Sequence, residues 1–480
     1  MKNNFYVTTP IYYANDKPHI GHAYTTVAAD VLARFHKLQK QDVFLLTGTD
    51  EHGLKIQKVA EKSGKNPQEF VDGIVGEYKK LWKDLNIEYS NFIRTTDENH
   101  KKAVQKVLQT LYDKSAIYKG EYEGLYCIGC EQFKNENELV DGKCPDHETV
   151  PEKLREECYL LKMTEKQKEL IEKIEKNEFE IAPEKYKNEI LSFLKSQALK
   201  DISISRKNVK WGIELPFNKE HTTYVWMEAF LNYLTGLGWD GLEEVRPLSA
   251  KTTIRGRTSD LDFWPPDVQL IGKDILRVHA TIWPIMLLHL GLPLPKLLFT
   301  HGHILSGGKK MSKTLGNVIT IEEVLEKFGV DGTRYLLLSA GTFGSDVDVT
   351  MERLIEKYNA DLANGLGNLV SRFVKLNDLM IPIGSNVALY KKEMLEKMEF
   401  DQCLNFVWSK IRNMNKFIED NKPWELAKTD QEKFTHVMQQ LYFGIYEISE
   451  SLIPFMPETS EKIKKALETK ESTILFQRIK

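Results

Sequence analysis

The stretch YYANDKPHIGH, residues 12–22, predicts a junction between a β-strand and an α-helix. Residues 4–9, which precede it, are aromatic and β-branched, as in a strand. After it, apolar residues recur at helical spacing as far as Leu38. The turn-forming sequence NDKP, residues 15–18, lies between the two, and a proline suits the start of a helix. We therefore expect a strand, a tight turn and a helix.

His19 and His22 fall on the first turn of this predicted helix, so their imidazoles should share one face. Backbone N–H groups at a helix start have no partner within the helix, which makes such a position suited to anions. Gly21 carries no side chain, so a flat ring can lie against the backbone there. Taken alone, however, the pattern fits equally well with two histidines that merely lie at the surface.

The composition is that of a globular protein with about two to four domains, since the chain has 480 residues, 41% hydrophobic and 28% charged. No basic N-terminal segment precedes an apolar run, and no apolar stretch approaches about 18 residues. We therefore expect a cytoplasmic protein with no membrane contact. The net charge of −3 argues against indiscriminate polyanion binding, but local lysines can still contact nucleic-acid phosphates.

A second strand–helix pair indicates a parallel, doubly wound sheet. Residues 43–49 resemble a buried strand that ends in DEHG, residues 50–53, and a helix is expected over 55–62. In such sheets ligands bind outside the carboxyl ends of the strands. Asp50 lies at such an end, where it could hold a substrate ammonium group or simply cap the next helix.

The sheet pattern is then interrupted by about 100 residues. Within this interruption, residues 165–200 are predicted to be helical and heavily charged. Residues 222–227 resemble a strand, residues 228–237 an aromatic-rich helix, and residues 268–274 a further strand end. From about residue 350 the pattern is almost wholly helical.

Four potential metal ligands follow the pattern C-x2-C-x13-C-x2-H: Cys127, Cys130, Cys144 and His147. This spacing is typical of a tetrahedral zinc knuckle with three thiolates and one imidazole. Because all four positions are filled, such a zinc would be structural. The alternative is a set of unrelated thiols or a redox pair.

A basic motif lies far downstream, where residues 306–317 are SGGKKMSKTLGN. Paired glycines before a lysine cluster indicate a mobile loop. Lys310 and Lys313 could there neutralise charge that develops on a leaving pyrophosphate. Without further context, a solvated surface loop is the simpler interpretation.

HIGH at residues 19–22 together with KMSKT at residues 310–314 resembles the paired signature of class I aminoacyl-tRNA synthetases, with Thr314 where that family often has serine. Within this class the chain resembles the methionyl-tRNA synthetase family over nearly its whole length. The matching segments are PIYYAN at 10–15, GTDEHG at 48–53, YVW at 224–226, IGKDI at 271–275 and KPW at 422–424.

The resemblance implies activation of methionine by ATP, with Mg²⁺, to methionyl-adenylate, followed by transfer to the terminal ribose of initiator and elongator tRNA(Met). The implied catalytic residues are His19, His22, Lys310 and Lys313. The implied ATP site adds Gly21, Gly272 and Asp274. The implied methionine site comprises Ile11, Tyr13, Asp50, Trp226, Ala229, Tyr233, Ile275, His279 and Trp283. The implied anticodon readers are Asn364, Asn368, Arg372 and Trp424, although Trp424 without the resemblance would be assigned to the core.

The implied fold is α/β: a Rossmann-like parallel-sheet catalytic domain with a zinc-binding insertion, followed by an all-α helical bundle. The expected segments are the first half of the catalytic domain (1–116), the insertion with the zinc knuckle (117–219), the second half (220–290), a linking region with the KMSKT loop (291–349) and the anticodon-binding domain (350–480).

Glu228 departs from the family pattern, which usually has aspartate there. A single knuckle indicates one zinc per chain. Because the chain ends after the helical domain, without the dimerisation module of some members, a monomer is expected.

Two alternatives remain open from the sequence. One is another class I synthetase, for cysteine or an aliphatic amino acid. Against it, the valine, isoleucine and leucine enzymes carry a far larger insertion, and a cysteine enzyme uses its zinc in the substrate pocket. The other is a tRNA-binding relative without catalysis. The intact His19, His22, Asp50 and Lys313 argue against it.

Overall fold

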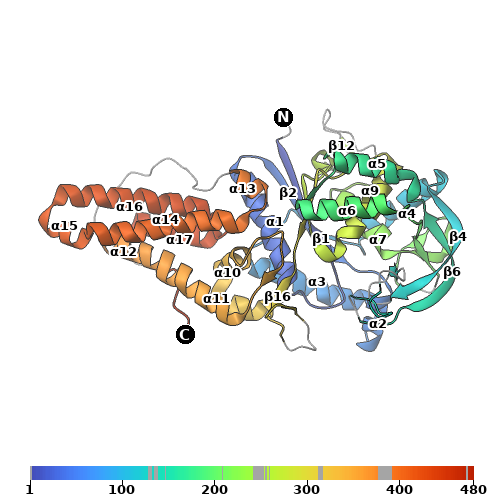
Figure 1. Cartoon of the computed structure of the whole chain (residues 1–480), viewed down its shortest axis with the longest axis horizontal. Helices are drawn as coiled ribbons and strands as arrows, with labels where there is room; N and C mark the ends of the chain where they lie inside the picture. The colour runs from blue at the N-terminus through green and yellow to red at the C-terminus, as the bar shows by residue number, and fades with distance from the viewer. Residues whose placement is uncertain are drawn as a thin grey trace. The chain divides into compact units, whose positions relative to one another are not determined.

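The computed structural model describes residues 3–127, 132–134, 139–145, 148–207, 209–241, 253–254, 257–258, 260–311, 317–376, 392–471 and 474–480. The chain divides into two compact units (Figure 1). Unit 1 comprises Met1–Pro18, Gln41–Leu81 and Glu88–Thr300, and unit 2 comprises His19–Lys40, Trp82–Ile87 and His301–Lys480. None of the helices in the described ranges is long and apolar enough to cross a membrane.

A six-stranded sheet forms the centre of unit 1, in the order β3-β2-β1-β14-β15-β7. Its strands are β1 (Asn4–Tyr13), β2 (Asp42–Asp50), β3 (Asn91–Arg94), β7 (Glu180–Ala182), β14 (Val268–Gly272) and β15 (Leu297–His301). The pairs β3–β2, β2–β1, β1–β14 and β15–β7 are parallel. The α/β fold with a Rossmann-like parallel sheet, expected from the sequence, is therefore confirmed.

The helices of unit 1 pack in two apolar cores, a large one shared with this sheet and a small one that contains Ala14, Ile56 and Val71. They are α2 (Leu54–Lys62), α3 (Pro67–Asp84), α4 (Glu98–Asp113), α5 (Thr164–Glu175), α6 (Glu184–Ser196), α7 (Val225–Ala229), α8 (Asn232–Thr235), α9 (Leu276–Leu290), and the 3₁₀ turns η2 (Asp260–Phe263) and η3 (Lys273–Ile275). The strands of unit 1 outside this sheet are β4 (Ile117–Cys127), β5 (Gln132–Lys134), β6 (Glu152–Leu161), β8 (Ile202–Ser203), β9 (Ser205–Arg206), β10 (Glu214–Leu215), β11 (Asn218–Thr223), β12 (Thr253–Ile254) and β13 (Arg257–Thr258).

Three sequence predictions in unit 1 differ from the structure, and one is the helix expected over 228–237, which is divided into α7 and α8. The expected helix over 165–200 is broken by β7, a strand of three residues at the edge of the sheet, because Phe179 and Ile181 are buried between two charged helices. The expected strand over 222–227 ends at Thr223, within an antiparallel sheet of β10, β11 and β9. Tyr224 then begins α7, and its backbone N–H donates to Ile204 O at 2.7 Å. Aromatic and β-branched residues here satisfy core packing rather than a strand preference.

Unit 2 consists mainly of helices, as the sequence predicted, and α16 packs against α14 and α17 (Figure 1). The helices are α1 (Ile20–Leu38), α10 (Ile321–Ser339), α11 (Met351–Lys357), the π-helix η5 (Tyr358–Gly367), α12 (Asn368–Leu376), α13 (Lys392–Glu396), α14 (Phe400–Asn421), α15 (Pro423–Thr429), α16 (Gln431–Leu452) and α17 (Pro457–Thr469). Three short strands, β16 (Ile304–Ser306), β17 (Lys309–Lys310) and β18 (Val347–Asp348), form a separate sheet.

One fully buried arginine connects four segments of unit 2. Arg334 of α10 donates from Nη2 to Asp30 Oδ2 of α1 at 2.7 Å and to Pro454 O at 2.9 Å. Its Nε donates to Phe455 O at 2.8 Å and its Nη1 to Leu85 O at 3.2 Å. Since the guanidinium is pre-organised for several donors at once, it satisfies carbonyl groups that would otherwise be buried without partners.

We predict that Arg334→Met lowers the free energy of unfolding by about 3–5 kcal/mol, because it removes a partner of buried Asp30 and leaves three carbonyls unsatisfied. Denaturant unfolding would measure this loss. The control is Arg353→Met, because Arg353 pairs with Asp348 at 2.9 Å with its side chain 65% exposed, and its loss should cost less than about 1 kcal/mol. Equal effects of the two substitutions would contradict the assigned role of Arg334.

Candidate functional site

His19 and His22 form the cap of α1 in unit 2. His19 Nδ1 accepts the Gly21 N–H at 3.1 Å, and His22 Nδ1 accepts the His19 N–H at 3.2 Å. The rings stack with their centroids 3.6 Å apart. A Cβ at Gly21 would lie 3.0 Å from His19 Cε1, so the missing side chain makes room for the His19 ring itself. The sequence predicts that the N–H groups at this helix start are available to an anion. The Gly21 N–H group, however, already donates to His19 Nδ1.

This cap fixes the proton positions on both rings. Each Nδ1 accepts a backbone N–H, so each neutral imidazole carries its proton on Nε2, an assignment that follows from the hydrogen bonds. Loss of solvation, and second the neighbouring His19, hold the pKa of His22 well below its usual range. The helix start thus carries two neutral imidazoles whose Nε2–H groups can donate to an oxyanion.

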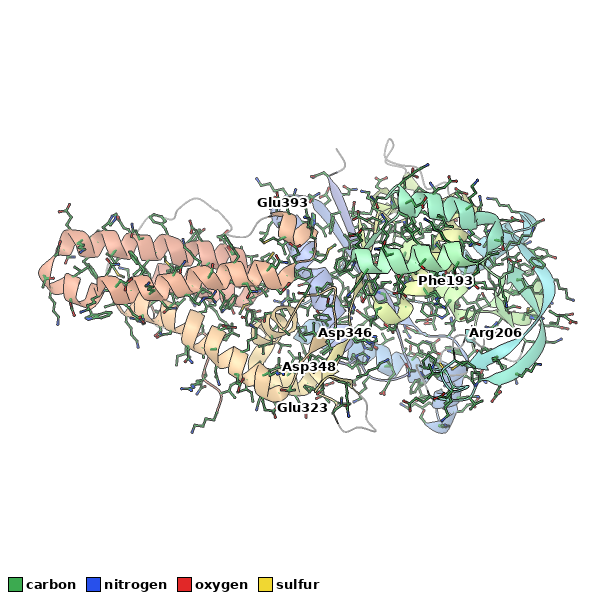
Figure 2. The ribbon with its side chains drawn as sticks, viewed as in Figure 1. Phe193, Arg206, Glu323, Asp346, Asp348 and Glu393 are labelled. Carbon is green, nitrogen blue, oxygen red and sulfur yellow. The ribbon has the colours of Figure 1, made fainter. Side chains whose placement is uncertain are left out.

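The two glycines before the lysine cluster form a tight turn between β16 and β17, and the mobility expected for the loop over 306–317 stays a prediction, because residues 312–316 lie outside the described residues. Gly307 and Gly308 have φ of 62° and 74°, as a two-residue hairpin turn of type I′ requires. Asp348, which is labelled in Figure 2, accepts the Gly308 N–H through Oδ1 at 2.9 Å and so holds the turn in place. Lys310 lies exposed at the end of this hairpin. Lys313 lies outside the described residues.

The carboxyl ends of β1 and β2 bring three predicted substrate residues together in unit 1. In the parallel register Ile11 pairs with Gly48 and Tyr13 with Asp50. The register shifts between Thr8 and Ile11, a β-bulge that admits a proline into a central strand. Asp50 is the last residue of β2 and is 8% exposed.

The residues on either side of Asp50 are held by buried polar contacts. Glu51 receives two hydrogen bonds of 2.8 Å from Arg94, and further ones from Thr49 and Thr96. His52 Nδ1 lies 3.0 Å from Glu228 Oε1. The strand end is therefore rigidly placed, and Asp50 is the carboxylate of this segment that the sequence assigns to a substrate ammonium.

An aromatic cluster of unit 1 contains most residues of the predicted methionine pocket. The His279 ring lies edge-on to Trp226, Phe230 and Tyr233, at centroid distances of 6.1, 5.0 and 6.1 Å. Trp283 stacks on Phe230 at 5.7 Å. Ala229 is buried in α7, and Ile275 is packed at the edge of the core. These side chains can form a flat apolar slot.

His279 is neutral, and its hydrogen bonds orient Tyr233. Burial lowers the pKa of His279 to about 4. Its Nδ1 lies 3.0 Å from Ile275 O, which can only accept, so Nδ1 carries the proton. Nε2 must then accept from the Tyr233 hydroxyl at 2.9 Å. His279 Nε2 and the Tyr233 hydroxyl are thus bonded to each other, which leaves the faces of these two rings for the substrate.

The remaining predicted ATP residues lie where β14 ends in unit 1. Gly272 is the last residue of β14 and is buried, whereas Asp274 lies exposed in η3. Both therefore lie at the carboxyl edge of the sheet, where ligands of doubly wound folds bind. Their part in ATP binding stays a prediction.

Two of the four predicted zinc ligands lie in the described residues. Cys127 ends β4, and both Cys127 and Cys144 are buried. Both also contact Thr149: Cys127 Sγ lies 3.9 Å from its Oγ1, and the Cys144 N–H donates to its carbonyl at 2.9 Å. Cys130 and His147 lie outside the described residues. In the ranges that the structure describes, no group of three or more metal-ligating side chains occurs.

The predicted anticodon readers lie at the surface of the bundle in unit 2. Asn364 in η5 and Asn368 at the start of α12 are exposed, and Arg372 is half-buried. Trp424 is 41% exposed, directly after Pro423 at the start of α15, so its assignment to the core is wrong. The Arg372 guanidinium lies 6.0 Å from the centre of the Trp424 ring.

A sequence model of one protein family, described as tRNA synthetases class I (M), matches residues 5–150 and 147–374. The methionine–tRNA ligase of Caldanaerobacter subterraneus subsp. tengcongensis is 42% identical, over 100% of this chain and 76% of that protein. The methionine–tRNA ligase of Clostridium acetobutylicum is 44% identical, over 97% of this chain and 73% of that protein. The chain belongs to the methionyl-tRNA synthetase family. It is an ATP-dependent ligase of class I.

Solved structures of this family agree with the fold. Mycobacterium tuberculosis methionyl-tRNA synthetase in complex with methionyl-adenylate is 33% identical with a TM-score of 0.86, over 97% of this chain and 93% of that chain. A second structure of that enzyme bound by methionyl-adenylate has a TM-score of 0.86 at 30% identity, over 99% of both chains.

Two aromatic residues of the pocket expected in a methionyl-tRNA synthetase escaped the sequence analysis. Phe230 lies four residues after Trp226 and three before Tyr233, so helical spacing could have revealed it. Trp264 lies 6.1 Å from Trp283, edge-on. It follows η2, and no local pattern in the sequence connects it with the pocket.

Proposed function

We propose that this chain activates methionine with ATP and transfers it to tRNA(Met). The aromatic cluster of Trp226, Phe230, Tyr233, His279 and Trp283 carries this proposal, together with the methionine–tRNA ligases that are 40–44% identical. Sulfur packs favourably on aromatic rings, and an unbranched side chain fits a flat slot. A relative without catalysis would have no need for the pre-oriented imidazoles at the start of α1.

In the first step, a methionine carboxylate oxygen bonds to the α-phosphorus of ATP, and the bond from this phosphorus to the pyrophosphate oxygen breaks. Asp50 and the Ile11 carbonyl hold the methionine ammonium. The Nε2–H groups of His19 and His22 donate to phosphate oxygens and cost no reorganisation, because the cap already holds both rings. Lys310 and Lys313 neutralise the departing pyrophosphate, and Mg²⁺ supplies further positive charge when it accompanies ATP.

In the second step, a terminal ribose hydroxyl of tRNA bonds to the carbonyl carbon of the adenylate, and AMP leaves. By resemblance to this subclass, the attacking group is the 2′-OH. Charge again develops on a phosphate, so the same donors serve both steps. No protein nucleophile takes part. The expectations of a cytoplasmic monomer that charges both initiator and elongator tRNA stay predictions.

Amino-acid-dependent exchange of pyrophosphate into ATP tests this function directly. With each of the twenty amino acids in turn, we expect exchange with methionine to exceed that with any other. An apolar slot gains only about 1–3 kcal/mol per methylene, so smaller aliphatic residues should react weakly and not at zero. Faster exchange with cysteine, valine, isoleucine or leucine, or no exchange at all, would contradict the proposal.

We also propose that Cys127, Cys130, Cys144 and His147 hold one structural zinc. The two described thiols are buried and share Thr149 as a neighbour, and the donor set of three thiolates and one imidazole suits tetrahedral zinc. Such a zinc would stabilise the fold around β4 and would take no part in either chemical step.

Elemental analysis of the purified chain should give one zinc per chain. In Cys144→Ser the zinc should be lost and the region around β4 should unfold locally, which proteolysis would reveal. The matched control is Cys403→Ser, because Cys403 is buried in α14, remote in the sequence from the four ligands. X-ray absorption that shows two sulfur ligands, or a bound water, would contradict a closed site.

Recognition of the tRNA anticodon by the face that contains Asn368, Arg372 and Trp424 is a further proposal. Unpaired loop bases are read by stacking and by hydrogen bonds to their edges. The exposed Trp424 ring offers a stacking surface, and the nearby Arg372 and Asn368 offer donors. The π-helix η5 directly precedes this face, and π-helical segments occur often at functional sites.

We expect Trp424→Ala to lower kcat/KM for tRNA charging about ten- to a hundredfold and to leave pyrophosphate exchange without tRNA unchanged. Phe406→Ala is the matched control, because Phe406 is 43% exposed and lies about 22 Å back along α14 from its end. If both activities fell together in Trp424→Ala, the residue would stabilise the bundle and would not read the anticodon.

A further inference from the structure

A buried hydrogen-bonded pair joins two segments that carry residues of the proposed methionine pocket. His52 Nδ1 lies 3.0 Å from Glu228 Oε1, although 176 positions separate the two residues in the sequence. Glu228 is fully buried and His52 is 4% exposed. His52 lies two residues beyond the end of β2, and Glu228 lies in α7. The pair therefore ties the end of a central strand to a helix on the wall of the pocket.

The residues next to this pair are those expected to contact methionine. Asp50 stands two positions before His52. In α7, Trp226 stands two positions before Glu228, and Ala229 directly follows it. A helix of five residues has little stability of its own, so neighbouring elements set the place of α7. The bond to His52 is one such contact, and it is a directional one.

Burial of this pair costs free energy of desolvation, and this cost indicates that the pair has a role other than stabilising the fold. Burial raises the pKa of Glu228, and the nearby His52 offsets this only in part. The other ionisable groups that act on the pair are Lys101, which lowers the pKa of Glu228, and His100, whose pKa burial lowers to about 3; Glu51, next to His52 in the sequence, is already paired with Arg94. Apolar side chains would avoid the desolvation cost altogether, whereas a polar pair fixes one geometry.

We propose that the His52–Glu228 pair sets the spacing between Asp50 and the wall at Trp226, and so tunes the fit of the methionine side chain. This inference rests on the proposed function, because it assumes that these neighbours bind methionine. His52 and Glu228 act through the residues beside them and are positioning residues.

The length of Glu228 is the parameter that matters. An aspartate side chain is one methylene shorter than glutamate, about 1.5 Å. In the setting of this chain, Glu228→Asp either breaks the bond to His52 or draws α7 toward β2. Both outcomes change the spacing across the pocket, whereas Glu228→Gln keeps the length of the side chain and one oxygen that can accept from Nδ1.

Pyrophosphate exchange with the full chain separates these cases. For Glu228→Asp we expect the KM for methionine to rise about tenfold, as the loss of one charged hydrogen bond allows. The KM for ATP, kcat and the melting temperature should stay close to wild type. Glu228→Gln should keep the KM for methionine within about threefold of wild type. Glu157→Asp is the control, because Glu157 pairs with Lys119 at the surface with its side chain 45% exposed.

A readout of selectivity completes the test. The ratio of kcat/KM for methionine to that for ethionine, which is one methylene longer, should change in Glu228→Asp and stay constant in Glu157→Asp. If Glu228→Asp and Glu157→Asp had the same KM for methionine and the same selectivity ratio in an active enzyme, this inference would be overturned. The proposed function would then still stand. Parallel losses of methionine binding, ATP binding and melting temperature would also overturn the inference, in favour of a structural role. A wild-type chain without methionine-dependent exchange would overturn the proposed function as well.

Discussion

The contact between Arg334 and Asp30 is the interaction on which unit 2 depends most. Asp30 is fully buried in the middle of α1, and a buried carboxylate is tolerated only when it is paired. Arg34, one turn further along α1, contributes a second hydrogen bond of 2.7 Å to the same oxygen. Arg334 also donates to the carbonyls of Pro454 and Phe455. The guanidinium that holds α1 therefore also holds the segment directly before α17. The helix that begins with the two histidines is thus held by long-range contacts and not by its own propensity.

Unit 1 pairs buried carboxylates in a similar way at the end of β2, where Asp50 and Glu51 are adjacent in the sequence and His52 contacts Glu228 from 176 positions away. Glu51 is matched by Arg94, and Glu228 by His52. Asp50 follows Thr49 at the edge of the sheet, flanked by these satisfied neighbours. Local pairing of the flanking groups lets one carboxylate serve a ligand, since a strand end with mobile neighbours could not hold it within the tolerance that binding requires.

Local patterns predicted the parts of the fold in which local and tertiary preferences agree. The first strand, turn and helix, the strand before Asp50 and the helical C-terminal part were all correct. The edge strand β7 was missed, because only three residues pair there and charged helices flank them on both sides. The run at 222–227 has strand composition but turns into α7, since its aromatic residues fill the core. The contacts of Arg334 and the His52–Glu228 pair join positions 120 to 304 residues apart, and no periodicity in the sequence predicts such contacts.

The histidine pair at the start of α1 shows how the fold and the chemistry use opposite sides of the same ring. Folding uses Nδ1 of His19 and His22, which accept the backbone N–H groups of Gly21 and His19. Because a neutral imidazole has one proton, this cap requires the proton to be on Nε2 in both rings. Protonation of either ring would turn its Nδ1 into a donor and break the cap, so helix formation itself favours the neutral state. The same requirement explains the glycine between the two histidines, because any Cβ there would push the His19 ring away from the N–H group it accepts.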